Sequence, residues 1–309
     1  MGVIEAGFSA DLEDGRGIGF YGMDNARIVK GTKNVDQALE AADLNWTVEK
    51  IPAGYKGENG EFVPAGAKFH LTQRTDTGAI IGKVGSQYSC FQNEQAFAFA
   101  DELLGFGAEF HAAGAFNGGA NVFLIAKLPE GIKVRGEEEM DLYLDMLNTH
   151  DGSGSISWYA TPIRRICTNQ TRLMIAQAVS SCKIRHTATA SERVAQAAAT
   201  LQLVDIYKAE LEAGITQLQD IEMNLEEVTN FLQDWSASEK VQKNVLSTYN
   251  SSDMVPRGNA WGVMNSITET LLHAPARRTA GESRFASALD GPHQRSVERA
   301  SRMLLRTVR

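Results

Sequence analysis

The sequence predicts an α+β fold: an antiparallel sheet core with packed helices, followed by a long amphipathic helix and a helical C-terminal segment. Two observations carry this prediction. In the first half of the chain, short segments of alternating apolar residues are separated by hairpin turn residues, which favours antiparallel strands. Residues 191–235 hold no proline and only one glycine, and their apolar residues fall at spacings of three and four, as on one face of a helix.

Turn residues and hydrophobic periodicity place the elements of the first half of the chain. Residues 1–34 are rich in glycine and aperiodic, which predicts an N-terminal arm. Asn93 is expected to cap a helix that runs to Leu104 and ends at Gly105. The other expected elements are a helix at 35–43, strands at 45–51, 68–74, 78–84, 108–115, 121–127, 132–135 and 141–148, and a loop at 52–66.

The second half is expected to be mostly helical after a strand–helix–strand segment near 156–166, 169–178 and 182–186. The pattern over 191–235 predicts a single helix that would approach ~60 Å in length if unbroken, at roughly 1.5 Å per residue. The predicted organisation is an arm at 1–34, an α+β core at 35–190, the long helix at 191–236 and a helical C-terminal region at 237–309.

The charge is unevenly distributed along the chain. The 309 residues carry a net charge of −8, so the total does not indicate a nucleic-acid-binding protein. Counted by segment, however, the charge is about −10 for 1–150, about +4 for 151–200, about −6 for 201–250 and about +4 for 251–309. An acidic chain of this kind can still hold a basic groove.

Cysteine usage and hydropathy predict a cytoplasmic protein. Cys90, Cys167 and Cys182 share no spacing typical of a metal site, and an odd number without a CxxC motif indicates reduced thiols. We expect no signal peptide, because the N-terminus lacks a basic start followed by an apolar run. No stretch approaches the roughly 20 apolar residues of a membrane span. We therefore expect no membrane partner.

The basic segment, residues 155–187, is the most informative part of the chain. It lies in a stretch without Asp or Glu between Asp151 and Glu192. Arginine makes bidentate contacts with phosphate, and aromatic rings stack on unpaired bases. The predicted nucleic-acid-binding residues are Arg164, Arg165, Asn169, Arg172, Lys183, Arg185 and Tyr159.

The two adjacent arginines also have a structural interpretation. Neighbouring residues on a strand point to opposite faces, so Arg164 and Arg165 should do so. The inward one would need a carboxylate partner, because a buried charge must be paired. The candidate partners are Asp145, Asp151 and Glu192.

The remaining site residues have structural alternatives as well. Asn169 is expected at a helix start, where free amide groups attract anions, and an ordinary helix cap is the alternative. Lys183 and Arg185 share one face of a short strand, which could simply be solvated. His186 is expected to be a buried, hydrogen-bonded histidine, and at most one of Trp158 and Tyr159 should be free to stack.

The sequence holds no motif of a known catalytic class. It has no GxGxxG ahead of an expected helix, no GxxxxGK[ST] and no GxSxG. The adjacent His150 and Asp151 leave open an enzyme of unknown chemistry. No spacing of His, Asp and Glu, however, suits a metal site. We therefore expect no catalytic residue, metal or cofactor.

Five stretches occur together in the order typical of one protein family. They are QALEAADLNWTVEK at 37–50, VGSQYSCFQN at 84–93, LNTHDG at 147–152, PIRRICTN at 162–169 and IRHT at 184–187. Over about residues 36–235 the chain resembles the phage/plasmid-like family, a domain of unknown function common in actinobacterial phages and mobile elements. This resemblance implies a phage or plasmid gene product that acts in the bacterial cytoplasm.

A more distant likeness concerns the layout of the elements. The run with Asn93, Phe99, Leu103 and Gly105, followed by 121–131, is similar to single-strand annealing proteins of the Rad, Red-beta and Erf kind. That likeness implies a β–β–β–α core, binding of single-stranded DNA, and assembly into rings or filaments. It also allows for a phage exonuclease as a partner.

The sequence therefore predicts a phage single-stranded DNA-binding protein that promotes strand annealing in recombination as a homo-oligomer, without catalysis. The alternative is a phage protein that binds a host or phage protein through its long helix, without DNA contact. The basic C-terminal residues Arg299, Arg302, Arg306 and Arg309, spaced by three or four, could be a second DNA contact, a partner helix or a solvated helix face.

Overall fold

A computed structural model describes residues 26–135, 138–164, 181–186, 204–236, 238–253, 255–273 and 292–306. Its centre is a seven-stranded sheet in the order β1-β7-β8-β10-β11-β12, with β9 also paired to β10. Every pairing in this sheet is antiparallel, which confirms the predicted α+β class. The strands are β1 (Ala26–Ile28), β7 (Glu109–Phe116), β8 (Asn121–Lys127), β9 (Ile132–Val134), β10 (Glu138–Thr149), β11 (Ile156–Arg164) and β12 (Ser181–Ile184).

Most of these strands lie where the sequence predicted them. β7 and β8 are joined by a tight turn, η2 (Asn117–Gly119), in which Gly118 and Gly119 adopt φ of 68° and 98°. Nearly every residue of β7 and β8 is buried, so both faces of the sheet centre are covered. The N-terminal arm predicted over 1–34 extends too far. Residues 26–28 belong to the sheet, because β1 pairs with β7, with Ala26 opposite Gly114. Residues 1–25 lie outside the described part of the chain.

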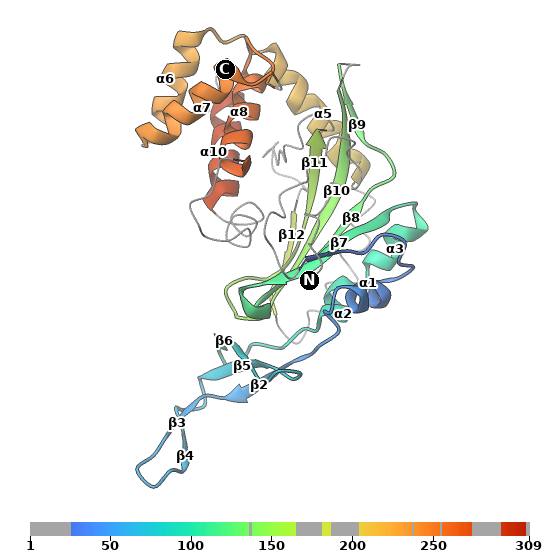
Figure 1. Cartoon of the computed structure of the whole chain (residues 1–309), viewed down its shortest axis with the longest axis vertical. Helices are drawn as coiled ribbons and strands as arrows, with labels where there is room; N and C mark the ends of the chain where they lie inside the picture. The colour runs from blue at the N-terminus through green and yellow to red at the C-terminus, as the bar shows by residue number, and fades with distance from the viewer. Residues whose placement is uncertain are drawn as a thin grey trace, which may run out of the picture.

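Three short helices cover one end of the main sheet, as Figure 1 shows. Asn34 caps α1 by accepting a hydrogen bond from the amide of Gln37. The predicted cap at Asn93 is wrong by one residue: Gln92 occupies the cap position and forms a capping box with Gln95. The helix expected from Asn93 to Leu104 is divided in two. The three helices are α1 (Val35–Ala41), α2 (Asn93–Phe97) and α3 (Ala100–Gly105).

A second, smaller sheet projects from the same end of the molecule (Figure 1). It has the order β2-β5-β6, and its β5–β6 hairpin confirms the turn predicted around residues 76–78. The loop expected at 52–66 is not irregular, because it contains a two-stranded hairpin, β3–β4, in which Tyr55 pairs with Val63. The strands are β2 (Val48–Pro52), β3 (Gly54–Lys56), β4 (Phe62–Pro64), β5 (His70–Arg74) and β6 (Ile80–Val84).

The long helix expected over 191–235 is not continuous where the structure describes it. α5 (Val204–Asp220) and α6 (Leu225–Trp235) are separated by residues 221–224. At this break the chain pairs with residues 258–260: Met223 donates to the carbonyl of Gly258, and Ala260 donates to that of Ile221. Asn224 then caps α6 by accepting from the amides of Glu226 and Glu227.

The C-terminal helices pack on each other at the other end of the main sheet (Figure 1). They include α7 (Glu239–Ser251), α8 (Ala260–His273) and α10 (Pro292–Arg306), which confirms the helical C-terminal region within the described residues. Trp235 Nε1 donates to the carbonyl of Ser296 at 3.0 Å, which fixes α6 against α10. The buried face of this group comprises Leu211, Ile215, Leu218, Val228, Leu232, Trp235, Trp261, Val297 and Leu304.

The close approach of Gly262 to Pro256 predicts a sensitive position in α8. A Cβ atom on Gly262 would lie 1.7 Å from the Pro256 carbonyl oxygen. Gly262→Ala should therefore lower the free energy of unfolding by about 2 kcal/mol, because backbone atoms must shift to make room. The matched control is Gly105→Ala at the end of α3, where a Cβ would meet nothing within 4 Å. Urea unfolding measures both, and equal stabilities would contradict the packing described here.

Candidate functional site

The structure describes only part of the predicted nucleic-acid site. Arg185 is exposed immediately after β12. The backbones of Tyr159, Arg164 and Lys183 are placed in the sheet, the first two on β11 and the third on β12. Arg165, Asn169 and Arg172 lie outside the described residues, as does the helix predicted at 169–178.

The last described part of the basic segment, β12, is the outermost described strand of the main sheet. Among the described strands it pairs with β11, with Lys183 opposite Ser157. An edge strand leaves one row of backbone groups available to a ligand. Trp158 is 5% exposed and packs on Phe99, with ring centroids 4.3 Å apart, so it belongs to the core. This agrees with the expectation that at most one of Trp158 and Tyr159 is free to stack.

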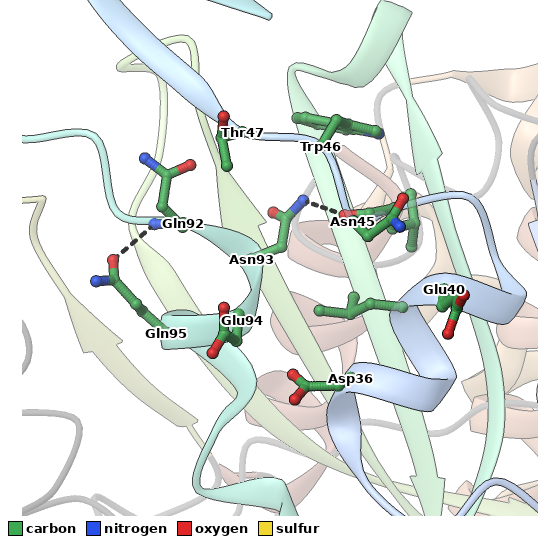
Figure 2. Close-up of a pocket in the computed structure, with 11 residues that line it drawn as sticks. Asp36, Glu40, Asn45, Trp46, Thr47, Gln92, Asn93, Glu94 and Gln95 are labelled. Carbon is green, nitrogen blue, oxygen red and sulfur yellow. Dashed lines mark hydrogen bonds between the residues drawn. The ribbon is translucent and has the colours of Figure 1, made fainter. Parts of the chain in front are cut away.

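Three of the five family-like stretches meet close to this edge. They form a largely buried group that we call the junction cluster: Tyr88, Asn93, Asn148, His150 and His186. Asn93 Oδ1 lies 2.8 Å from His150 Nε2 and accepts from Asn148 Nδ2 at 3.2 Å. Asn93 Nδ2 donates to the Leu44 carbonyl at 3.0 Å (Figure 2). The Asn93 amide therefore links α2 and the segment before β2 to the end of β10.

His186 anchors the chain next to the exposed Arg185. Its ring stacks on Tyr88, with centroids 5.0 Å apart and planes 16° from parallel. Its carbonyl accepts from the amide of Ser89 at 3.2 Å, and Tyr88 Oη donates to the Thr149 carbonyl at 3.0 Å. The expectation of a buried histidine is confirmed, although its ring nitrogens have no hydrogen-bond partner among the described residues. This anchoring fixes the position of Arg185 at the sheet edge.

Burial keeps the titratable groups of the junction cluster neutral. Loss of solvation lowers the pKa of His150 to about 3 and that of His186 to about 4. Repulsion from a protonated His186 and from Arg74 makes up the smaller part of the lowering of the His150 pKa. Loss of solvation also raises the pKa of the Tyr88 hydroxyl. At neutral pH the cluster therefore acts through hydrogen bonds and packing.

His150 and Asp151 are adjacent in sequence but engaged separately. His150 pairs with Asn93, whereas Asp151 Oδ1 accepts from the amide and hydroxyl of Ser153 at 2.9 and 2.6 Å. Among the described residues, no group of three or more His, Cys, Asp or Glu side chains is arranged to hold a metal ion. The arrangement gives His150 a structural role in joining α2 to β10.

A lysine on the small sheet contributes positive charge near Arg185. Lys50 Nζ donates to the carbonyls of Ser86 and Tyr88 at 2.8 and 2.7 Å. The same loop bonds to the backbone of His186 through Ser89. Lys50 and the residue after Arg185, His186, therefore bind the same loop, between β6 and α2.

The pocket in Figure 2 has the opposite charge. It has a volume of about 400 Å³ and lies between α1, α2 and the segment that leads to β2. Its charged lining residues are Asp36, Glu40 and Glu94, so it repels phosphate. Trp46 closes one side, with the Arg74 guanidinium carbon 4.1 Å from its ring centroid. This pocket is therefore not part of a nucleic-acid interface.

Sequence reasoning identified the family-like stretches but not the junction cluster that they build. Asn148, near the end of β10, and His150, directly after it, are both fully buried. The run of polar residues Asn148, Thr149 and His150 after the apolar pair Met146 and Leu147 is the feature that could have revealed them, because buried polar groups need partners.

Comparison with known proteins gives one match. The family model of a "Domain of unknown function (DUF932)" matches residues 80–290. No curated protein and no solved structure matches the chain. The matched range contains the whole junction cluster and the basic segment. Within the described residues, no helix is long and apolar enough to cross a membrane.

Proposed function

We propose that this chain, which belongs to the DUF932 family of domains of unknown function, binds single-stranded DNA and promotes strand annealing. The observation that supports the proposal is the position of Arg185, which is exposed directly after the outer described strand β12 and next to the buried His186. Guanidinium groups at a sheet edge can hold a phosphate backbone while the bases remain available for pairing.

The proposed activity is non-covalent. Arg164, Arg165, Arg172, Lys183 and Arg185 would contact phosphates, Asn169 would present backbone amides, and Tyr159 would stack on a base. Weak contacts of this kind gain strength when identical subunits bind one strand, so the protein would act as a ring or filament. The proposed setting is the cytoplasm of a bacterium that carries a phage, where an exonuclease would supply single strands.

No specific observation favours the alternative function, in which a long helix binds a host or phage protein. Within the described residues, the predicted helix is broken at 221–224. Much of the apolar surface of α5 and α6 is buried in the core of this chain, although Leu225 is 54% exposed. We therefore do not propose this function.

Neutralising three arginines tests the proposed interface. Replacing Arg164, Arg165 and Arg185 together by alanine should raise the Kd for a labelled oligothymidylate by about 100-fold at matched salt, because several phosphate contacts are lost. Fluorescence anisotropy measures the Kd, and circular dichroism checks that the variant is folded.

The matched control removes the same charge elsewhere. The control uses three exposed lysines, one just before α1 and two on α7: Lys33, Lys240 and Lys243. Their triple alanine variant should bind nearly as well as the wild type. The interface is not where we place it if the arginine variant keeps wild-type affinity. The same conclusion follows if both variants lose affinity for the oligonucleotide equally.

A further inference from the structure

The β3–β4 hairpin and its base form an arm without a core. No residue from 53 to 69 is buried, and Figure 1 shows the hairpin as the tip of the molecule farthest from the main sheet. A two-stranded hairpin is only marginally stable by itself in water. An exposed hairpin of this kind is therefore suited to gain contacts from a ligand.

Three aromatic rings are exposed on this arm. Tyr55, Phe62 and Phe69 are 61%, 60% and 47% exposed, respectively. Exposed apolar residues are common singly, but three exposed aromatic side chains within residues 55–69 are more than isolated cases. Large rings offer flat surfaces on which unpaired bases can stack.

Two of the three rings lie beside a lysine. Lys56 is directly opposite Phe62 in the β3–β4 register, so both side chains project from the same face of the hairpin. Lys83 Nζ lies 5.7 Å from the ring centroid of Phe69. A ring paired with an ammonium group fits one nucleotide, because the base can stack while the ammonium reaches the phosphate.

The backbone around Phe62 leaves room for its ring. A Cβ on Gly54 would lie 2.3 Å from Phe62 Cζ, so the ring rests over Gly54 and extends outward from there. The carboxylate of Glu61 is held in the turn, where its Oε2 accepts from the amide of Asn59 at 3.0 Å. The ring is thus held in a defined place by the hairpin itself.

We propose that the arm is a base-stacking element of the single-stranded DNA path, with Phe62 and Phe69 as the stacking rings and Lys56 and Lys83 as their phosphate contacts. This inference rests on the function proposed above and extends the path from the sheet edge onto the small sheet. Lys50 on β2 binds the loop between β6 and α2, and the same loop bonds to the backbone of His186.

Ring substitutions test the stacking. Phe62→Ala with Phe69→Ala should raise the Kd for oligothymidylate by about tenfold or more, with little change in its salt dependence. Phe62→Leu with Phe69→Leu should be as weak as the alanine pair, because leucine is apolar but cannot stack. Lys56→Gln with Lys83→Gln should instead make binding less dependent on salt.

A tryptophan at position 62 gives a direct signal. The four native tryptophans are between 1% and 8% exposed, so Phe62→Trp adds the one strongly exposed indole among them. Its fluorescence should be quenched by oligothymidylate, and its affinity should match the wild type. Absence of quenching while the protein binds DNA would overturn the stacking proposal.

The outcomes separate the arm from the underlying function. If the wild type binds DNA and the alanine pair binds equally well, only the arm proposal fails. If the wild type does not bind single-stranded DNA, the proposed function fails as well. If the alanine pair loses affinity and sedimentation shows that it also forms a smaller assembly, the arm is a contact between copies of the chain. The base-stacking proposal is then wrong.

Discussion

Lowering the pH from 7 to 5 is expected to reduce the free energy of unfolding by about 4 kcal/mol, or about 2 kcal/mol for each of His150 and His186. Burial lowers their folded pKa values to about 3 and about 4, whereas an unfolded histidine titrates near its usual 6.5. Between these values the unfolded chain binds protons that the folded chain does not. The two histidines therefore contribute their full stabilisation above pH 6.5. This stabilisation is lost progressively as the pH falls toward about 4 for His186 and about 3 for His150.

Urea unfolding at several pH values between 7 and 5 measures this loss. The charges around the two rings include Asp151, which favours protonation of His186, and Arg74, which opposes protonation of His150. A His186→Phe variant keeps a ring for stacking on Tyr88 and removes one titrating group, so its acid sensitivity should be about half that of the wild type. A stability that does not change between pH 7 and 5 would contradict the burial of the junction cluster.

Replacing Asn93 by alanine is expected to lower the free energy of unfolding by about 3 kcal/mol. The side chain of Asn93 donates to the Leu44 carbonyl and pairs with both Asn148 and His150. Its removal leaves buried polar groups without partners, at about 1–3 kcal/mol for each group. Asn45→Ala is the matched control, because Asn45 is exposed a short distance along the chain.

The variant Asn93→Asp adds a more specific measurement. A carboxylate next to His150 would favour its protonated form and raise the pKa of His150 from about 3. The loss of stability on acidification should then begin at the same pH but be smaller than in the wild type. If Asn93→Ala and Asn45→Ala are equally stable, the hydrogen bonds of Asn93 do not hold α2 to β10 as described.

The sequence predicts the antiparallel sheet well, because the apolar run of 121–127, the alternation in 141–148 and the turn residues between strands are local properties. It fails where local patterns conflict with tertiary contacts. The apolar stripe over 191–235 runs on across residues 221–224, and the break depends on hydrogen bonds to residues 258–260, far along the chain. Only Asn224 and Glu227, which form a capping box, mark this break in the sequence.

Short elements and buried polar contacts explain the other failures. The prolines and glycines of 52–66 indicate a loop, and strands of three residues are too short to show an alternating pattern against them. Asn93 has the chemistry of a helix cap, yet its side chain is buried beside His150 while Gln92 caps the helix. The burial of His186 could be predicted, but its stacking on Tyr88 could not, because the two residues are brought together only by the fold.

The most direct measurement for single-stranded DNA binding is the affinity of the wild-type protein for a labelled oligothymidylate across a range of salt concentrations. We expect binding at low salt, with the logarithm of the association constant falling linearly as the logarithm of the salt concentration rises, since each phosphate contact releases counterions. A duplex of the same length should bind more weakly, because its bases cannot stack on the protein. No binding at the lowest salt concentration, or an affinity that does not depend on salt, would contradict the proposed function.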